Sequence, residues 1–160
     1  MSQSMGLENL KLYRKSAVRK IADKHLTIFV KRVNKGIDAH GRSFKPYTKT
    51  YAEMKARGMN KIRGGKYKQY YGIPTSRQIN PPDFRLRGLT LLNLKRMQIR
   101  KDSYTLRFSG EAARIVEGNQ KRGRDIWTDI PDKEMNYLVN LFEQEIDKEI
   151  TKLKNVKIVI

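Results

Sequence analysis

The sequence predicts an α+β fold in which long N-terminal and C-terminal helices pack on a small antiparallel sheet, with a long basic arm. Three observations support this prediction. Apolar residues recur with a helical period near both ends of the 160-residue chain. Two short segments between these helices alternate in polarity, as strands do. A Gly-, Lys- and Tyr-rich stretch at 59–80 shows neither period, so we expect an extended arm within a single domain that spans 1–160.

The first helix is predicted over residues 7–35. Its apolar side chains recur at i, i+1, i+4 and i+5 and form one broad face, while Lys and Arg fill the other face. Gly36 ends this helix, and Lys35 suits the negative end of the helix dipole. The apolar face consists of Ala17, Val18, Ile21, Ala22, His25, Leu26, Phe29, Val30 and Val33.

Residues 36–51 are predicted to form an ordered corner between the first two helices. Gly36 and Gly41 bracket Asp38, and glycine adopts positive φ at little cost. Asp, Ser and Thr side chains close local turns by hydrogen bonding to the backbone, which argues against a floppy linker. The residues that we assign to this structural corner are Asp38, Gly41, Phe44, Pro46 and Tyr47.

A short second helix follows over about 50–57, with Thr48 or Thr50 as its cap and Gly58 as its end. The basic arm at 59–80 comes next, and a rigid Asn-Pro-Pro-Asp segment closes it. The arm interleaves basic and aromatic side chains that we expect to contact a partner or DNA. They are Lys61, Arg63, Lys66, Tyr67, Lys68, Tyr70 and Tyr71.

Residues 86–94 are predicted to form a short helix or a helix that runs into a strand. Strands over 95–101 and 104–109 then form a β-hairpin, with Asp102-Ser103 as a two-residue turn. Met97 and Ile99 share one face of the first strand. The second strand alternates Tyr104, Leu106 and Phe108 against Thr105 and Arg107.

The C-terminal part of the chain is predicted to hold two more helices. Residues 111–117 form one or two helical turns that Gly118 stops, and 125–131 include a short extended stretch. Asp132 caps the last helix, which continues to about Lys154. Its apolar face consists of Met135, Leu138, Val139, Leu141, Phe142, Ile146, Ile150 and Leu153, and its predicted anchors are Ile126 and Trp127.

The net charge of +19 is spread unevenly along the chain. Residues 1–80 carry 19 basic and 4 acidic side chains, whereas residues 126–160 carry 5 basic and 7 acidic ones. Such a field favours a polyanionic partner, either nucleic acid or an acidic protein surface. It also allows the acidic end of one copy to contact the basic body of the next.

Several classes of function are excluded or disfavoured. The chain has no cysteine, so a disulfide framework and a thiolate zinc site are impossible. No apolar run approaches the ~20 residues of a membrane span, and the N-terminus lacks a signal-peptide core. We therefore expect a soluble protein made in the cytosol, with no membrane partner.

Catalytic chemistry is poorly represented, and we expect no enzyme and no cofactor. His25 lies on the apolar face of the first helix, and His40 lies in the corner, so structural roles are expected for both. Gly64-Gly65 lacks the context of a phosphate-binding loop. Four carboxylates of the last helix are expected to lie on its solvated face: Glu143, Glu145, Asp147 and Glu149. A nuclease that uses these carboxylates is the weaker alternative.

Two interpretations of the basic arm stay open. Its lysines and arginines can contact phosphates while its tyrosines stack on bases, which indicates nucleic-acid binding without sequence preference. Alternatively, the arm is a charged loop that becomes ordered against a neighbouring protein, because tyrosine is also frequent in interfaces. No helix-turn-helix, zinc-finger or ribonucleoprotein signature accompanies it, so sequence-specific recognition is not expected.

Four motifs follow one another in a distinctive order: G-x-D-A-x-G-R-S-F-K-P-Y-T-K-T-Y after the long helix, L-R-G-L-T-L before the hairpin, E-A-A-R-I-V-E-G-N-Q after it, and R-D-I-W-T-D-I-P-D-K-E-M at the start of the last helix. This order resembles the tail-completion (virion morphogenesis) proteins of tailed phages and the related neck proteins of the head–tail junction. Arg87 and Asp125 depart from the family pattern, which has threonine and proline there.

The resemblance implies a structural virion protein, assembled in the host cytoplasm, that forms a homo-oligomeric ring at the head–tail junction. Its partners would be the portal or connector and the tail proteins of the same virion, with non-specific contact to packaged DNA. The alternative is a non-specific nucleic-acid-binding protein that uses the basic residues 1–80.

Overall fold

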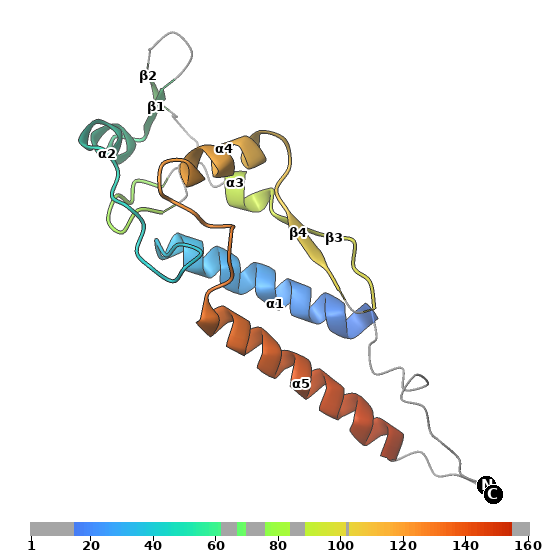
Figure 1. Ribbon diagram of the computed structural model, residues 1–160. Helices are drawn as coiled ribbons and strands as arrows, with labels where there is room; N and C mark the ends of the chain where they lie inside the picture. Colours follow the sequence, from blue (N-terminus) through green and yellow to red (C-terminus); the bar gives the residue numbers. More distant parts are fainter. Residues whose placement is uncertain (1–14, 62–66, 70–75, 84–88, 102, 155–160) are drawn as a thin grey trace, which may run out of the picture.

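The computed structural model describes residues 15–61, 67–69, 76–83, 89–101 and 103–154 (Figure 1). The chain is helix-rich, with antiparallel strand pairs between long helices near its two ends, which confirms the predicted α+β class. The elements are α1 (Lys15–Asn34), α2 (Lys49–Ala56), β1 (Met59–Lys61), β2 (Tyr67–Gln69), α3 (Leu89–Leu92), β3 (Lys95–Met97), β4 (Thr105–Arg107), α4 (Gly110–Gln120) and α5 (Asp132–Lys154).

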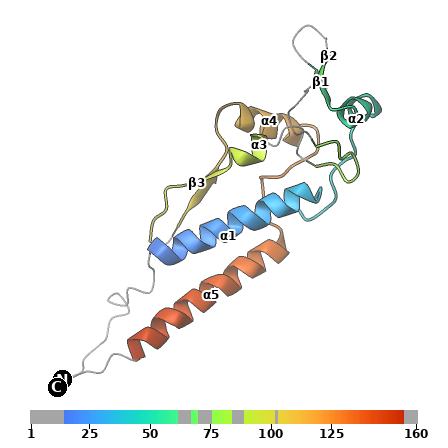
Figure 2. The ribbon, with the colours of Figure 1, turned by 180° about the vertical axis from the view of Figure 1, so that it is seen from behind.

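Three layers make up the lower half of the molecule in Figure 1. The β3–β4 ribbon packs on one side of α1, and α5 runs along the opposite side of α1 (Figures 1 and 2). The last helix thus packs on the first helix, whereas the sequence suggested direct packing of both on the sheet. The helix α1 is therefore the central element of the fold.

The central position of α1 follows from its broad apolar face. The side chains of Val18, Ile21, Ala22, His25, Phe29 and Val33 are all buried, as predicted, and Arg32 is buried with them. The helix ends before Gly36, whose φ of +73° and whose N–H bond to the Val33 carbonyl (3.0 Å) close the last turn. Residues 7–14 of the predicted helix lie outside the described residues.

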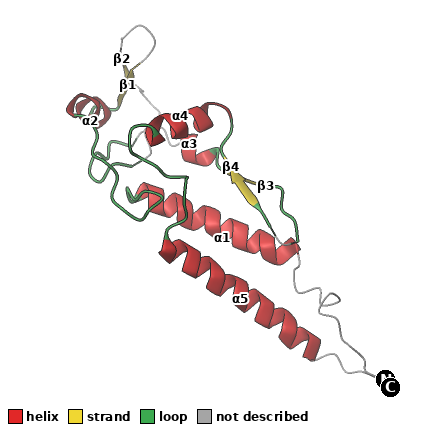
Figure 3. Cartoon of the chain, in the orientation of Figure 1, coloured by secondary structure: helices red, strands yellow, loops and turns green. Residues whose placement is uncertain are grey.

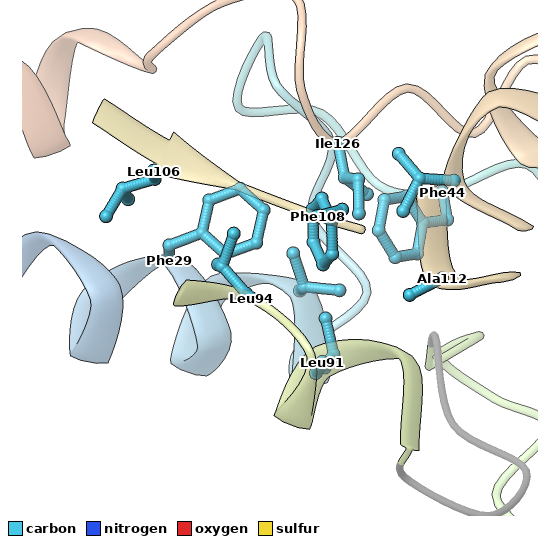
Figure 4. Close-up of a cluster of buried hydrophobic side chains, with 10 residues drawn as sticks. Phe29, Phe44, Leu91, Leu94, Leu106, Phe108, Ala112 and Ile126 are labelled. Atoms are coloured by element: carbon cyan, nitrogen blue, oxygen red, sulfur yellow. The ribbon is translucent and has the colours of Figure 1, made fainter. Parts of the chain in front are cut away.

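The hydrophobic core lies where α1, the corner, α3, β4, α4 and the segment before α5 meet (Figure 4). Burial of an aliphatic or aromatic side chain of this size stabilises the fold by roughly 1.5–3 kcal/mol. These segments are far apart in the sequence, from Phe29 to Ile126, and the core joins them in one body. Its buried members are Phe29, Val33, Phe44, Leu91, Leu94, Leu106, Phe108, Ala112, Val116 and Ile126.

The β3–β4 hairpin forms in a different register from the predicted one. Lys95 pairs with Arg107 and Met97 with Thr105, which is not the pairing that a two-residue turn at Asp102-Ser103 gives. Asp102 itself lies outside the described residues. The side chain of Leu106 is buried against α1, as predicted, but Met97 is 44 % exposed on the other face. The register follows the burial of β4, because a slip of one residue turns every side chain to the opposite face.

The arm at 59–80 contains regular structure that the sequence did not indicate. The strands β1 and β2 pair antiparallel, with Met59 opposite Gln69 and Lys61 opposite Tyr67. Two strands of three residues are too short to show a period of two, which explains why the pattern was not visible. Residues 62–66 and 70–75 of the arm lie outside the described residues.

Two predictions for the C-terminal part of the chain are also corrected. Gly118 does not stop α4, which runs on to Gln120, and Gly123 (φ +76°) closes the turn after it. Residues 126–128 form a bend, and α5 begins at Asp132 as predicted. Of the apolar face predicted for this helix, Leu138 is buried, whereas Met135 and Val139 are exposed. Within the described ranges, no helix has the length and apolar character that crossing a membrane requires.

Candidate functional site

The corner predicted at 36–51 is built around the buried carboxylate of Asp38. Its Oδ1 accepts hydrogen bonds from the backbone N–H groups of His40 (2.9 Å) and Arg42 (2.8 Å), and Arg42 Nε donates to Oδ2 (3.2 Å). Gly41 turns the chain with a φ of +78°. The Asp38 N–H then donates to the Arg42 carbonyl (2.7 Å), so the corner is a closed loop.

The rest of the corner connects this loop to the core and to α2. Phe44 is buried in the core, and its N–H donates to the Gly36 carbonyl (2.7 Å). Pro46 is exposed, and its neighbour Tyr47 is half-buried with its ring centroid 4.9 Å from that of Tyr51. Burial raises the pKa of the Tyr47 phenol well above its ordinary value, so the phenol stays protonated and acts as a donor.

Residues 76–83, at the end of the arm, are bound to α2 by a buried ion pair that the sequence did not reveal. The ammonium of Lys55 is fully buried against the carboxylate of Asp83 and the carbonyl of Gln78. The hydroxyl of Ser76 donates to the same carboxylate, and that of Tyr47 donates to the Asp83 backbone carbonyl. Lys55 therefore contributes to the interior of the protein and not to its basic surface.

The corner and the segment before α5 form a single unit, which we call the joint (residues 36–47 and 124–134). The Ala39 N–H donates to the Asp125 carbonyl (2.7 Å). Arg124 donates from Nε to the Lys45 carbonyl and from Nη2 to the Pro46 carbonyl, both at 3.0 Å. Arg124 and Lys45 are 79 positions apart in the sequence, so the joint is a tertiary feature.

Arg32 ties α1 and α5 to the joint. Its side chain is 6 % exposed and donates to the Ile37 carbonyl (3.1 Å), the Ile126 carbonyl (3.2 Å) and Glu134 Oε1 (2.8 Å). Burial raises the pKa of Glu134, and the guanidinium beside it acts in the opposite direction. The sequence held a signal for this role, because Arg32 lies seven residues after His25 on the apolar face of α1.

The two predicted anchors of the last helix both contact the core. Ile126 is fully buried, and the half-exposed Trp127 ring packs edge-on against Phe29 (5.6 Å between centroids) and Phe108 (5.1 Å). Asp125 Oδ1 accepts the N–H groups of Trp127 (2.9 Å) and Thr128 (3.1 Å). The Asp125 side chain therefore shapes the bend.

The predicted structural histidines take places that fit this role. His25 is buried, and its Nδ1 lies 2.8 Å from the Tyr104 hydroxyl. Burial, together with the nearby charge of Arg32, lowers the pKa of His25, so the ring is neutral at pH 7. His40 is exposed in the corner loop, where its Nε2 lies 3.7 Å from Asp125 Oδ2.

The carboxylates of the last helix divide into two groups. Glu143 and Asp147 are exposed, as predicted, but Glu145 is largely covered and bonds to Lys148 (2.9 Å) and Lys20 (3.2 Å). These hydrogen bonds, that from Lys148 first, lower the pKa of Glu145. Across the part of the chain that the structure describes, no group of three or more His, Asp and Glu side chains is placed to hold a metal ion.

Two groups of basic residues, one on α1 and one on the arm, are candidates for contact with a polyanion. Four exposed lysines, spaced four, seven and four residues apart, share one side of α1 and its C-terminal end, and we call them the lysine stripe: Lys20, Lys24, Lys31 and Lys35. Of the predicted arm residues, Lys61 lies on β1, and Tyr67 and Lys68 lie on β2. Arg63, Lys66, Tyr70 and Tyr71 lie outside the described residues.

Comparison of the chain with protein-family models, with curated proteins and with solved structures finds no match. We therefore base the functional proposal on the sequence motifs and on the geometry of the joint and the exposed surfaces.

Proposed function

We propose that the chain is a structural subunit of the head–tail junction of a tailed-phage virion, a tail-completion or neck protein. In this role it assembles as a ring around the DNA channel and joins portal-side proteins to tail-side proteins. The observation that carries the proposal is the joint, where the two most distinctive motifs of the resemblance bond directly to each other.

The joint uses its charged groups for architecture. The side chains of Arg32, Asp38 and Arg124 are each directed at backbone groups of another segment or of the same loop. Such bonds fix the direction in which α5 leaves the body, and the edge-on contact of the Trp127 ring with Phe29 reinforces it. A fixed angle between the faces of a subunit is what a closed ring needs, because head-to-tail contacts close only at one rotation per copy.

The charge distribution supports the same proposal. A ring subunit around packaged DNA would meet phosphates on its inner side, and the lysine stripe offers four basic groups for them without reading sequence. Localisation in the virion, after assembly in the host cytoplasm, belongs to this proposal.

The experiment that tests the proposal is cryo-electron microscopy of virions whose copy of this chain carries a small tag. We expect a ring of density for the tagged chain between portal and tail. When the chain is deleted, we expect the lysate to contain heads and tails that are not joined. Complete, infectious virions in which the chain is absent would contradict the proposal.

A second candidate is a non-specific nucleic-acid-binding protein that uses residues 1–80. The lysine stripe favours it, because three of its members, Lys24, Lys31 and Lys35, form no described ion pair. If this candidate is correct, DNA binding by the isolated chain is tight at low salt, and the logarithm of the affinity falls steeply with the logarithm of the salt concentration. Tight binding by a monomer that never enters virions would favour this candidate over the first.

A further inference from the structure

The outer side of α5, turned away from α1, is acidic and apolar. Positions 135, 139, 143 and 147 recur every four residues and share this side of the helix with the half-buried Ile146 and Ile150. Met135 and Val139 are 43 % and 45 % exposed, and the Glu143 and Asp147 side chains are exposed beside them. Exposed apolar groups of this size rimmed by charge are typical of an interaction surface.

The outer face of the β3–β4 ribbon is basic and apolar. Leu106 and Arg96 pair with each other and face α1, where Arg96 forms an ion pair with Asp23. The other face of the ribbon is therefore turned to solvent, and it carries the exposed side chains of Lys95, Met97, Thr105 and Arg107. The neighbouring helix α3 adds Leu89 and Leu92, which are 49 % and 75 % exposed.

The two surfaces face in opposite directions within one subunit. The ribbon, α1 and α5 form successive layers, with α1 in the middle (Figure 3). Copies that follow one another head to tail, each turned by a fixed angle about a common axis, therefore bring α5 of one copy against the ribbon of the next.

We propose that the outer side of α5 in one copy docks on the outer face of the β3–β4 ribbon and α3 in the next copy, which makes a head-to-tail contact between identical chains. This inference rests on the proposed ring and names its interface. Charge selects this arrangement over a symmetric one. Pairing of α5 with α5 would bring Glu143 and Asp147 of both copies together, and pairing of two ribbons would oppose Lys95 and Arg107.

Cysteine cross-linking tests the geometry directly, because the chain contains no cysteine of its own. Chains with Val139→Cys and chains with Met97→Cys are mixed and oxidised, and we expect a disulfide between the two kinds of chain. Tyr137→Cys is the matched control, since Tyr137 is 42 % exposed but lies on the other side of α5. A disulfide between two Val139→Cys chains, or equal yields for Tyr137→Cys, would overturn the proposed contact.

Charge exchange tests the energetics by sedimentation of the full chain. Glu143→Lys with Asp147→Lys, or Lys95→Glu with Arg107→Glu, should each raise the Kd of self-association about tenfold or more, because like charges then face each other. An equimolar mixture of the two variants should restore assembly, since unlike charges then meet where the altered α5 of one variant docks on the altered ribbon of the other.

Three outcomes separate this inference from the proposed function. If the wild-type chain forms rings and charge exchange has no effect, the interface is wrong and the ring stands. If the chain self-associates as described but is absent from virions, the interface stands and the proposed function fails. A wild-type chain that stays monomeric at its highest soluble concentration would overturn the interface.

Discussion

At the scale of single residues, the fold depends on charged side chains placed among apolar ones. Arg32 lies in the apolar face of α1 and bonds to the corner, to the segment before α5 and to Glu134 at the start of α5. A buried ion pair contributes little relative to an apolar pair of the same shape, yet the loss of one partner is costly because the other charge is left buried. Arg32 and Glu134 are therefore expected to act as a pair.

We predict that Arg32→Met lowers the free energy of unfolding at pH 7 by about 3 kcal/mol. Without the guanidinium, burial alone acts on Glu134 and raises the pKa of its carboxyl further above the ordinary 4.5. The carboxylate gains a proton as the pH falls through that raised pKa, so the penalty is present at pH 7 and shrinks toward acid pH. Urea denaturation at a series of pH values measures this loss.

Two control variants accompany the measurement. The double variant Arg32→Met with Glu134→Leu should recover much of the stability, because no buried charge remains. Arg42→Met removes an exposed partner of Asp38 and should cost less than about 1 kcal/mol. A loss for Arg32→Met that does not change with pH would argue against the unpaired carboxylate as its cause.

Gly36 is the second residue whose identity is dictated by its surroundings. A Cβ at this position would lie 2.5 Å from the Pro82 carbonyl oxygen and 2.8 Å from the Pro81 Cβ, in addition to the cost of a positive φ. We predict that Gly36→Ala lowers the free energy of unfolding by about 3 kcal/mol, as overpacking adds to backbone strain. Gly41→Ala is the matched control, because Gly41 has a similar φ of +78° but its nearest neighbour lies 3.9 Å away.

The denaturation midpoints of the two glycine variants separate strain from crowding. Gly41→Ala should lose about 1 kcal/mol from the positive φ alone. Equal losses for both variants would show that the prolines near Gly36 move aside at no cost, against this prediction.

At the scale of elements, the helices and strands were predictable where their period was long enough to see. The faces of α1 and the alternation of Leu106 and Phe108 were predicted correctly, because burial of one side leaves a periodic trace in the sequence. The end of α4 was predicted incorrectly, because a glycine can stop a helix or be tolerated within it. The helix continues past Gly118, and the Lys121 N–H still donates to the Glu117 carbonyl (3.1 Å) beyond that glycine.

We therefore predict that Gly118→Ala raises the free energy of unfolding by about 0.5–1 kcal/mol. Nothing lies within 4 Å of a Cβ built at this position, and its backbone is helical, so alanine reduces the entropy of the unfolded chain without strain. The same change at Gly123, where φ is +76°, should destabilise the protein instead. Thermal unfolding of both variants measures the difference, and a loss at Gly118 would contradict the helical boundary.

At the scale of the whole molecule, the exposed surfaces of α1, α5 and the β3–β4 ribbon differ in charge and polarity. The lysine stripe lies on α1, the acidic and apolar surface on α5, and the basic and apolar surface on the ribbon. In the proposed ring the last two meet between copies, which leaves the lysine stripe as the surface that can meet a polyanion.

We predict that Lys24→Gln, Lys31→Gln and Lys35→Gln together weaken DNA binding and reduce the salt slope by roughly two to three, because each phosphate that is no longer neutralised removes about 0.9 from the slope. The measurement is fluorescence anisotropy with double-stranded DNA of mixed sequence at several salt concentrations. Self-association should stay unchanged, because these lysines lie outside the proposed interface. An unchanged slope would show that the stripe does not bind DNA.

The sequence by itself determined the local features of this protein: the apolar face of α1, the ordered corner around Asp38, the start of α5 and the uneven charge. These features depend on residues within one or two turns of each other, so side-chain period and turn chemistry are sufficient to predict them. The tertiary structure alone decided the hairpin register, the pairing of Lys55 with Asp83 and the contact of the corner with Arg124. Each of these three contacts joins groups that are distant in the sequence. The partners are selected because the contact buries both groups and satisfies their hydrogen bonds, and a local sequence pattern carries no information about such a choice.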